Sequence, residues 1–395
     1  MRLELFLIPL STLTGRAINF LTYAYLAKQL PLDDFNSLSY FLSIQVYLTI
    51  IFNAGLDSFY LNRISGNPHK LMYKIISLNL LISIFFSLLI LILNKQDIFP
   101  LVLTCFIAWT FSIQKIKAVE YQNDRNFRQV AKFEVIPQVF SLILSVVFIE
   151  LFSTNYLMRL LALSIGFLYV ASFAFKHIFK KQILFSIHEI KAFFIFSIPV
   201  VINALLSISK GVLERFLIDF DKIGSYFLCY TLASIVLAFN LGITRYFQPN
   251  IFSILKLRQS SIMGILKKYI FFMIILGVIQ TLLFILLKDL LINVFSSVIK
   301  VEDFIIILQF LISFILLSIN SLLSIIYIYF GKTSAILYVS VISFIVYFGA
   351  LIFLNYHDYE IIFYPSASII SNLILVLLSI IYVHFKISNE ALCQK

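Results

Sequence analysis

The chain has 395 residues, of which 61% are hydrophobic and only 12% charged, with a formal net charge of +11. A mean hydropathy of +1.01 excludes a water-soluble domain of this size, so we expect an all-α integral membrane protein. The basic residues lie between apolar runs and form no basic surface of the kind that binds nucleic acid.

The apolar runs predict twelve membrane-spanning helices. A helix needs about 20 apolar residues to cross the hydrocarbon core. The predicted spans are 3–26, 37–60, 75–93, 99–114, 130–151, 157–175, 192–213, 223–243, 269–287, 304–327, 334–354 and 361–384. The first is too long for the apolar core of a cleaved signal, so we expect a retained helix. No segment is left over for a soluble domain.

Lysine and arginine predict the orientation of these spans. With the N-terminus placed in the cytoplasm, 21 of the 30 basic residues fall on the cytoplasmic side and 8 on the opposite side. Arg16 lies within the membrane. Because cytoplasmic loops carry the excess of Lys and Arg, we predict that both chain ends are cytoplasmic.

Similar segments in the two halves of the chain predict an internal repeat. Ile8-Pro9 in the first span matches Ile198-Pro199 in the seventh, and Ser-Tyr-Phe-Leu occurs at 39–42 and again at 225–228. We therefore expect two six-helix lobes, residues 1–175 and 192–385, around a central cavity. Residues 176–191 would connect them and 386–395 would form a cytoplasmic tail. Pro9 and Pro199 are candidate gating positions, although proline is also tolerated in membrane helices without such a role.

Arg16 is the first candidate site residue, because it lies near the middle of the first span. Arginine at a helix centre costs roughly 2.5 to 3.5 kcal/mol on insertion scales. It therefore usually faces a protein interior, where a partner or ligand stabilises it. We expect it to bind an anionic substrate group. The alternative is a structural ion pair with Asp57 or Glu214.

The end of the seventh span carries a second group of charges. Lys210 and Glu214 are one helical turn apart and share a face, and Arg215 and Asp219 follow. If the helix continues to Ile218, these charges can face the cavity, with Lys210 and Arg215 binding an anion and Glu214 and Asp219 acting in ion pairing or coupling. If it stops at Leu213, the later three are ordinary rim charges in water.

Two further charges lie near the cytoplasmic ends of spans. Asp57 either carries a coupling proton or pairs with Arg63. Arg245 either receives an anionic head group or extends to the membrane interface, as long basic side chains commonly do.

The motifs that the chain lacks point away from catalysis. It has no Gly-x4-Gly-Lys-[Ser/Thr] phosphate-binding loop, no His-Glu-x-x-His and no Cys-x-x-Cys. We therefore expect no enzymatic activity, no cofactor and no metal site.

Several short segments together resemble one transporter family. They are Pro9 with Arg16, residues 30–36 before Tyr40, Gly55-Leu56-Asp57 before Arg63, Ser197-Ile198-Pro199 before Glu214-Arg215, and Gly331-Lys332-Thr333. On these residues the chain resembles the polysaccharide-repeat flippases (O-antigen translocases of the Wzx type) of the multidrug/oligosaccharidyl-lipid/polysaccharide exporter superfamily. It departs from the family pattern in carrying Glu214 instead of Asp and in lacking the glycine-rich segment before the last helix.

This resemblance implies a function in the bacterial cytoplasmic (inner) membrane. The protein would turn an undecaprenyl-pyrophosphate-linked oligosaccharide from the inner to the outer leaflet by alternating access, beside other polysaccharide-assembly proteins. The basic site residues suit a pyrophosphate. One alternative is a multidrug or cation exporter of the same superfamily, and a second is a polytopic polysaccharide-assembly enzyme. The sugar and the coupling ion stay open.

Overall fold

The computed structural model describes residues 7–62, 68–94, 97–124, 126–178, 186–256, 262–329, 333–357 and 359–392, and these ranges contain helices and no strand. The chain divides into two compact units: unit 1, Met1–Leu205, and unit 2, Leu206–Lys395. The boundary falls inside a helix that begins at Ile187, within the predicted connection at 176–191. Residues 179–185 of that connection lie outside the described ranges.

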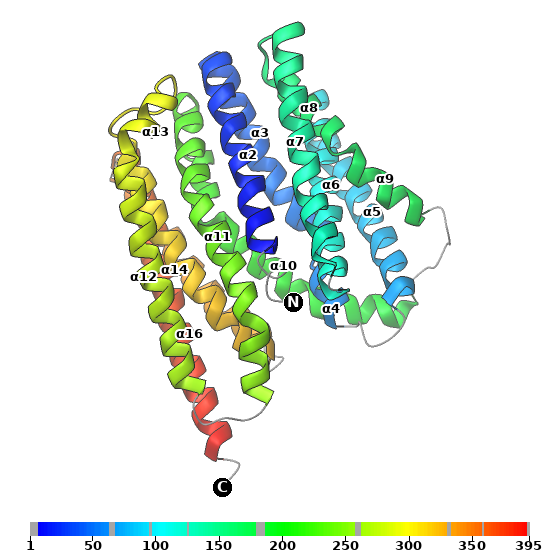
Figure 1. Ribbon diagram of the computed structural model, residues 1–395, viewed down its shortest axis with the longest axis vertical. Coiled ribbons are helices and arrows are strands. Elements are labelled where there is room, and N and C mark those ends of the chain that lie inside the picture. Colours follow the sequence, from blue (N-terminus) through cyan, green and yellow to red (C-terminus); the bar gives the residue numbers. More distant parts are fainter. Residues whose placement is uncertain are drawn as a thin grey trace. The chain divides into compact units, whose positions relative to one another are not determined.

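Unit 1 contains eight helices among its described residues and most of a ninth. They are α2 (Leu7–Gln29), α3 (Leu32–Asn53), α4 (Leu56–Asn62), α5 (Pro68–Leu93), α6 (Ile98–Asn123), α7 (Phe127–Leu151), α8 (Tyr156–Gly166), α9 (Leu168–Ile178) and α10 (Ile187–Val212), whose last turns belong to unit 2. In unit 1, α2 packs against α7, α3 against α6, and α7 against α8 (Figure 1).

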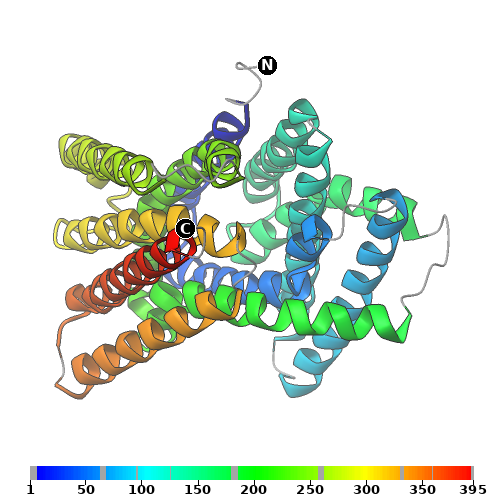
Figure 2. The ribbon, with the colours of Figure 1, turned by 90° about the horizontal axis from the view of Figure 1, so that it is seen from below.

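Unit 2 continues with long helices and three short 3-10 turns. They are η1 (Leu213–Phe216), η2 (Phe220–Lys222), α11 (Ile223–Lys256), α12 (Ile262–Leu286), α13 (Lys288–Val294), α14 (Phe304–Tyr329), α15 (Thr333–Tyr356), η3 (Ile361–Phe363) and α16 (Tyr364–Leu392). Figure 2 shows four of them in a row, in the order α12, α14, α16 and α15. Helix α11 packs against α14.

Eleven helices of the described residues are long and apolar enough to cross a membrane. They coincide with the second to twelfth predicted spans, so the chain is a multi-pass membrane protein. Helix α2 occupies the first predicted span but is not among the eleven, because Arg16, Asn19 and its hydroxyl residues lower its hydropathy. The total of twelve and the grouping into two six-helix lobes stay predictions.

The fourth span is longer than the sequence indicates. We predict 99–114, whereas α6 continues to Asn123. The additional turns are polar but buried: Lys117 is 3% exposed and forms an ion pair with Glu120, which is 5% exposed. Hydropathy places the helix end too early because it scores these two charges as water-facing.

Two backbone irregularities in unit 1 are satisfied by amide side chains. Helix α3 ends where Ala54 and Gly55 take positive φ angles of 48° and 71°, and Asn79 from α5 donates to the carbonyl of Phe52 at 2.7 Å. Pro137 in α7 lacks the N–H that the carbonyl of Phe133 would accept. Gln114 from α6 donates to that carbonyl at 2.7 Å. Such pairing is what makes irregular backbone tolerable in a membrane.

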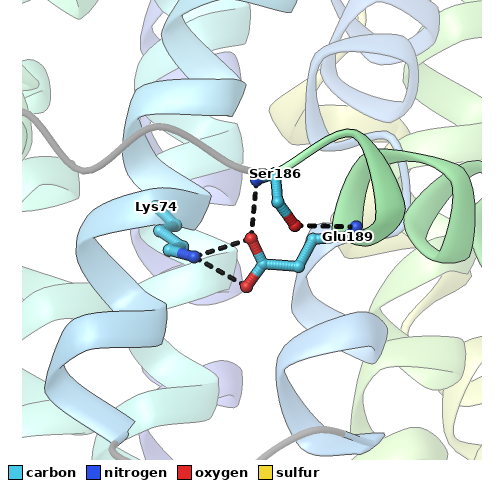
Figure 3. A network of polar contacts seen from close by, with 3 residues as sticks. All are labelled: Lys74, Ser186 and Glu189. Carbon is cyan, nitrogen blue, oxygen red and sulfur yellow. Dashed lines mark hydrogen bonds and ion pairs between the residues drawn. The ribbon is translucent and has the colours of Figure 1, made fainter.

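An ion pair joins the start of α10 to α5 (Figure 3). Lys74 Nζ lies 2.6 and 2.7 Å from the two carboxylate oxygens of Glu189. Ser186 and Glu189 also form a reciprocal capping box, with each backbone N–H donating to the other side chain. Glu189 therefore both caps α10 and holds it against α5.

Candidate functional site

The seventh predicted span is broken in unit 2. Lys210 has ψ 109° and Gly211 has φ 90°, so regular α-helix stops there and η1 follows. The hydroxyl of Tyr347, on α15, donates to the carbonyl of Ser209 at 3.1 Å and accepts from the N–H of Gly211 at 3.2 Å. One side chain thus satisfies both backbone groups at the break. Broken helices of this kind form substrate and ion sites in many transporters.

Lys210 is buried at the break, with 6% of its surface exposed. Its Nζ donates to Ser343 Oγ at 2.6 Å and to Asn372 Oδ1 at 3.2 Å. Both partners are neutral, and they come from α15 and α16. No carboxylate of the described residues lies within ion-pair distance of Lys210. Its positive charge is therefore held by oxygen dipoles alone.

Glu214 and Arg215 follow on η1 and are also buried. Glu214 is fully buried and accepts hydrogen bonds from the hydroxyl of Tyr226 and, at 3.1 Å, from Ser368 Oγ. The Arg215 guanidinium lies over two aromatic rings, 4.4 Å from the centre of Tyr230 and 4.9 Å from that of Phe227. These cation–π contacts and the neighbouring Glu214 stabilise a cation at membrane depth.

The structure differs from both sequence interpretations of this segment. Regular α-helix stops at Lys210 and Gly211, yet Glu214 and Arg215 are not rim charges in water, because η1 packs them into unit 2. Asp219 alone is exposed, with its carboxylate 3.6 Å from Lys222. The predicted shared face of Lys210 and Glu214 assumes a regular helix, which the break at Gly211 interrupts. Both side chains still contact α16, Lys210 at Asn372 and Glu214 at Ser368.

Arg159 is a buried charge that sequence analysis did not select. It lies on α8 with 1% of its surface exposed, and its Nη1 donates to Ser141 Oγ, Ser141 O and Ser145 Oγ at 2.9, 3.1 and 2.7 Å. It is one of the eight basic residues that the predicted topology places on the outer side. The sequence offered one signal. Arg159 is the third residue of the sixth predicted span, and the preceding helix carries two serines one turn apart.

The remaining predicted site residues are dispersed. In unit 1, Arg16 on α2 is exposed, and Asp57 on α4 is half-buried and accepts from the N–H of Ser58 at 2.8 Å. The alternative partner of Asp57, Arg63, lies outside the described residues. Pro199 is half-buried within α10.

For Pro9 on α2 and Arg245 on α11, the structure describes the backbone only. Of the predicted residues, it therefore brings together Lys210, Glu214 and Arg215. Sequence analysis missed the hydrogen-bond partners Ser343, Ser368 and Asn372, because Ser and Asn within apolar runs form no pattern that marks them. Among the described residues, no group of three His, Cys, Asp or Glu side chains is placed to hold a metal.

No protein-family model and no curated protein sequence matches the chain. Solved structures do match it. A multidrug resistance MATE family transporter of the MOP superfamily in an inward-facing conformation superposes with a TM-score of 0.73 at 11% identity, covering 98% of each chain. An outward-facing structure of that description gives 0.64 at 11% identity, over 98% of this chain and 96% of the other.

A third match is a variant of the Vibrio cholerae MATE transporter VcmN, with a TM-score of 0.63 at 16% identity over 99% of this chain and 97% of the other. At these identities the likeness shows the fold alone. The chain therefore has the all-helical MATE transporter fold over nearly its whole length, and the proteins that share this fold here are transporters, not enzymes.

Proposed function

We propose that this chain is an alternating-access membrane exporter of amphipathic organic compounds. The observation that carries the proposal is its whole-length likeness to multidrug transporters solved in inward-facing and outward-facing conformations. These comparisons favour the exporter alternative over the predicted lipid-linked oligosaccharide flippase, because the matched proteins are described as multidrug transporters.

The broken helices supply candidate moving parts for this function. Unit 1 has a break at Gly55 between α3 and α4, and unit 2 has one at Gly211 in α10. Helix segments on either side of a break can tilt with less loss of hydrogen bonding than a continuous helix. Pro199 in α10, and Pro9 in α2, are further positions at which the proposal places bending.

The test is efflux of a cationic dye from cells that lack their own exporters. Expression of the wild type is expected to lower dye accumulation several-fold, and an uncoupler of the membrane potential and proton gradient is expected to restore it. Cells that express Gly211→Ala at the same membrane level should accumulate as much dye as cells without the protein. Equal accumulation with and without the wild type, over dyes of several shapes and charges, would contradict the exporter proposal.

A second candidate is the flipping of a polyprenyl-pyrophosphate-linked oligosaccharide. One observation favours it: Arg159 and Lys210 are buried cations whose hydrogen-bond partners are neutral, and Arg215 adds a third. Buried positive charge attracts an anionic pyrophosphate and repels an organic cation. The polyprenyl tail would stay in lipid while the sugar crosses a polar interior, so no sugar hydroxyl enters hydrocarbon.

Deletion of the gene separates the two candidates. A flippase deletion should accumulate lipid-linked repeat units on the cytoplasmic face and lose surface polysaccharide, and the wild-type gene, but not Arg215→Glu, should restore both. Normal surface glycan together with new sensitivity to cationic dyes would favour the exporter. Glycosyltransferase and polymerase genes beside this gene would support the flippase and its partnership with polysaccharide-assembly proteins.

A further inference from the structure

The ammonium of Lys210 lies in a buried group of oxygen atoms. Ser343 Oγ and Asn372 Oδ1 contact it directly, and both residues are almost fully buried, at 0% and 2% exposure. Ser371 and Ser313 lie behind these two ligands and are also buried. The group comes from α14, α15 and α16, so several long helices of unit 2 build it.

The hydrogen bonds behind the two ligands turn their lone pairs toward Lys210. Ser343 Oγ donates to the carbonyl of Ser371 at 2.6 Å, so its proton points away from the ammonium. Asn372 Nδ2 donates to Ser313 Oγ at 2.9 Å and to Ser313 O at 3.3 Å, which leaves Oδ1 facing Lys210. The site is thus preorganised to accept a positive charge.

Neutral oxygen ligands are the kind that hard monovalent cations take from a protein. An ammonium is itself a compact point charge with strong hydration, and oxygen atoms at hydrogen-bond distance replace its water. Glu214 has Tyr226 and Ser368 as partners and forms no ion pair with Lys210. The oxygen group therefore holds the cation without a carboxylate.

We propose that Ser343 and Asn372 form a monovalent-cation site in unit 2 and that Lys210 occupies it as a tethered cation. The break in α10 supports this arrangement, because Tyr347 fixes the backbone on both sides of Lys210. Lys210 then supplies the cation at this position, and unit 2 takes no ion from solution there. The proposal concerns binding and holds whether or not the protein exports a compound.

The test is thermal unfolding of the purified full-length protein in NaCl, KCl and choline chloride at equal ionic strength. The wild type is expected to unfold at the same temperature in all three. Lys210→Ala leaves space and oxygen ligands, so its unfolding temperature should rise by several degrees in NaCl or KCl relative to choline, saturating with concentration. Lys210→Ala/Asn372→Leu should lose that response.

Two controls match the size and the charge of the change. Lys210→Met fills the same space without charge and should show no cation response. Lys222→Ala removes an exposed lysine of the same unit and should behave as the wild type. If Lys210→Ala does not accumulate, Lys210→Ser takes its place, since it also leaves room for an ion.

Three outcomes would overturn the proposal. One is a folded Lys210→Ala or Lys210→Ser variant that no alkali cation stabilises over choline. Another is a wild type stabilised by Na⁺ or K⁺ in a way that Asn372→Leu abolishes, since the dissolved ion would then occupy the site. The third is failure of both small variants to accumulate in any salt while Lys210→Met accumulates, which would assign Lys210 a space-filling role.

Discussion

Gly211 combines a positive φ with close side-chain neighbours. Its φ of 90° disfavours any residue with a Cβ, and a Cβ placed there would lie 2.7 Å from Tyr230 Cε2 and 3.0 Å from Phe310 Cε1. We expect Gly211→Ala to lower the free energy of unfolding by about 1–3 kcal/mol, from backbone strain and overpacking. Thermal or denaturant unfolding in detergent measures this.

Gly264→Ala is the matched control, because a Cβ at that helical position has no neighbour within 4 Å. Alanine is the better helix former, so this variant should be neutral or more stable by less than about 1 kcal/mol. Equal stability of the two variants would show that the break at Gly211 is not a constrained feature.

Arg16 carries a prediction about transport. It is exposed on α2, and we expect Arg16→Ala to abolish transport while the protein remains in the membrane. Arg16→Lys should retain part of the activity, since lysine preserves the charge but not the planar fork of donors. The transport assay that the wild type supports measures both. Lys28→Ala, exposed at the end of the same helix, is the control, and normal transport by Arg16→Ala would contradict an anion-binding role.

The sequence predicts the charged members of the site better than their partners. Lys210, Glu214 and Arg215 are conspicuous because charge is rare in an apolar run. Ser343 and Asn372 are not, because small polar side chains occur throughout membrane helices. The break at Gly211 was also missed: a lone glycine in a helical pattern is usually tolerated, and its positive φ depends on Tyr347, which is 136 residues away.

At the scale of elements, the ion pair between α5 and α10 gives a prediction about stability that does not depend on the transport function. Lys74→Met removes the ion pair, and Glu189→Gln removes it while keeping a capping-box acceptor. Each should cost at most about 1 kcal/mol, because the Glu189 side chain is 43% exposed. The double variant should cost little more than one single change. Unfolding of the four proteins in a double-mutant cycle measures the coupling.

Lys191→Met is the control for this cycle, because Lys191 is exposed on the same helix, two residues after Glu189. Glu189→Ala should cost more than Glu189→Gln, since it removes the cap as well as the ion pair. Strictly additive effects of Lys74→Met and Glu189→Gln would mean that the contact contributes no stability.

Hydropathy placed the long helices correctly because the bilayer imposes a minimum apolar length on each of them. It did not place their irregularities. The interruption between α3 and α4 and the break in α10 depend on side chains of other helices, Asn79 and Tyr347. The polar end of α6 depends on a buried ion pair within the helix, between Lys117 and Glu120. A one-dimensional average contains no information on those contacts.

At the scale of the whole molecule, fold and substrate are decided by different evidence. A TM-score of 0.73 at 11% identity places the chain in the MATE transporter fold, but a fold alone does not fix a substrate. Among the described residues, the buried cations are Lys117, Arg159, Lys210 and Arg215, and the buried carboxylates are Glu120 and Glu214. This excess of positive charge favours an anionic substrate. The names of the matched proteins favour drug export, and only the cellular tests above distinguish the two.

The last prediction concerns the orientation of the chain in the membrane. The excess of Lys and Arg on alternate loops predicts that both ends are cytoplasmic. A reporter that is active only outside the cytoplasmic membrane should give signal after Asp97, Tyr156, Lys300 and Tyr356, and none after Lys181 or Lys395. A reporter active only in the cytoplasm should give the opposite pattern at every site. Each missed span would invert all later loops. Signal from the first reporter at Lys181 would therefore contradict an even number of spans before Lys181. Signal from that reporter at Lys395 alone would place the error in the second half of the chain.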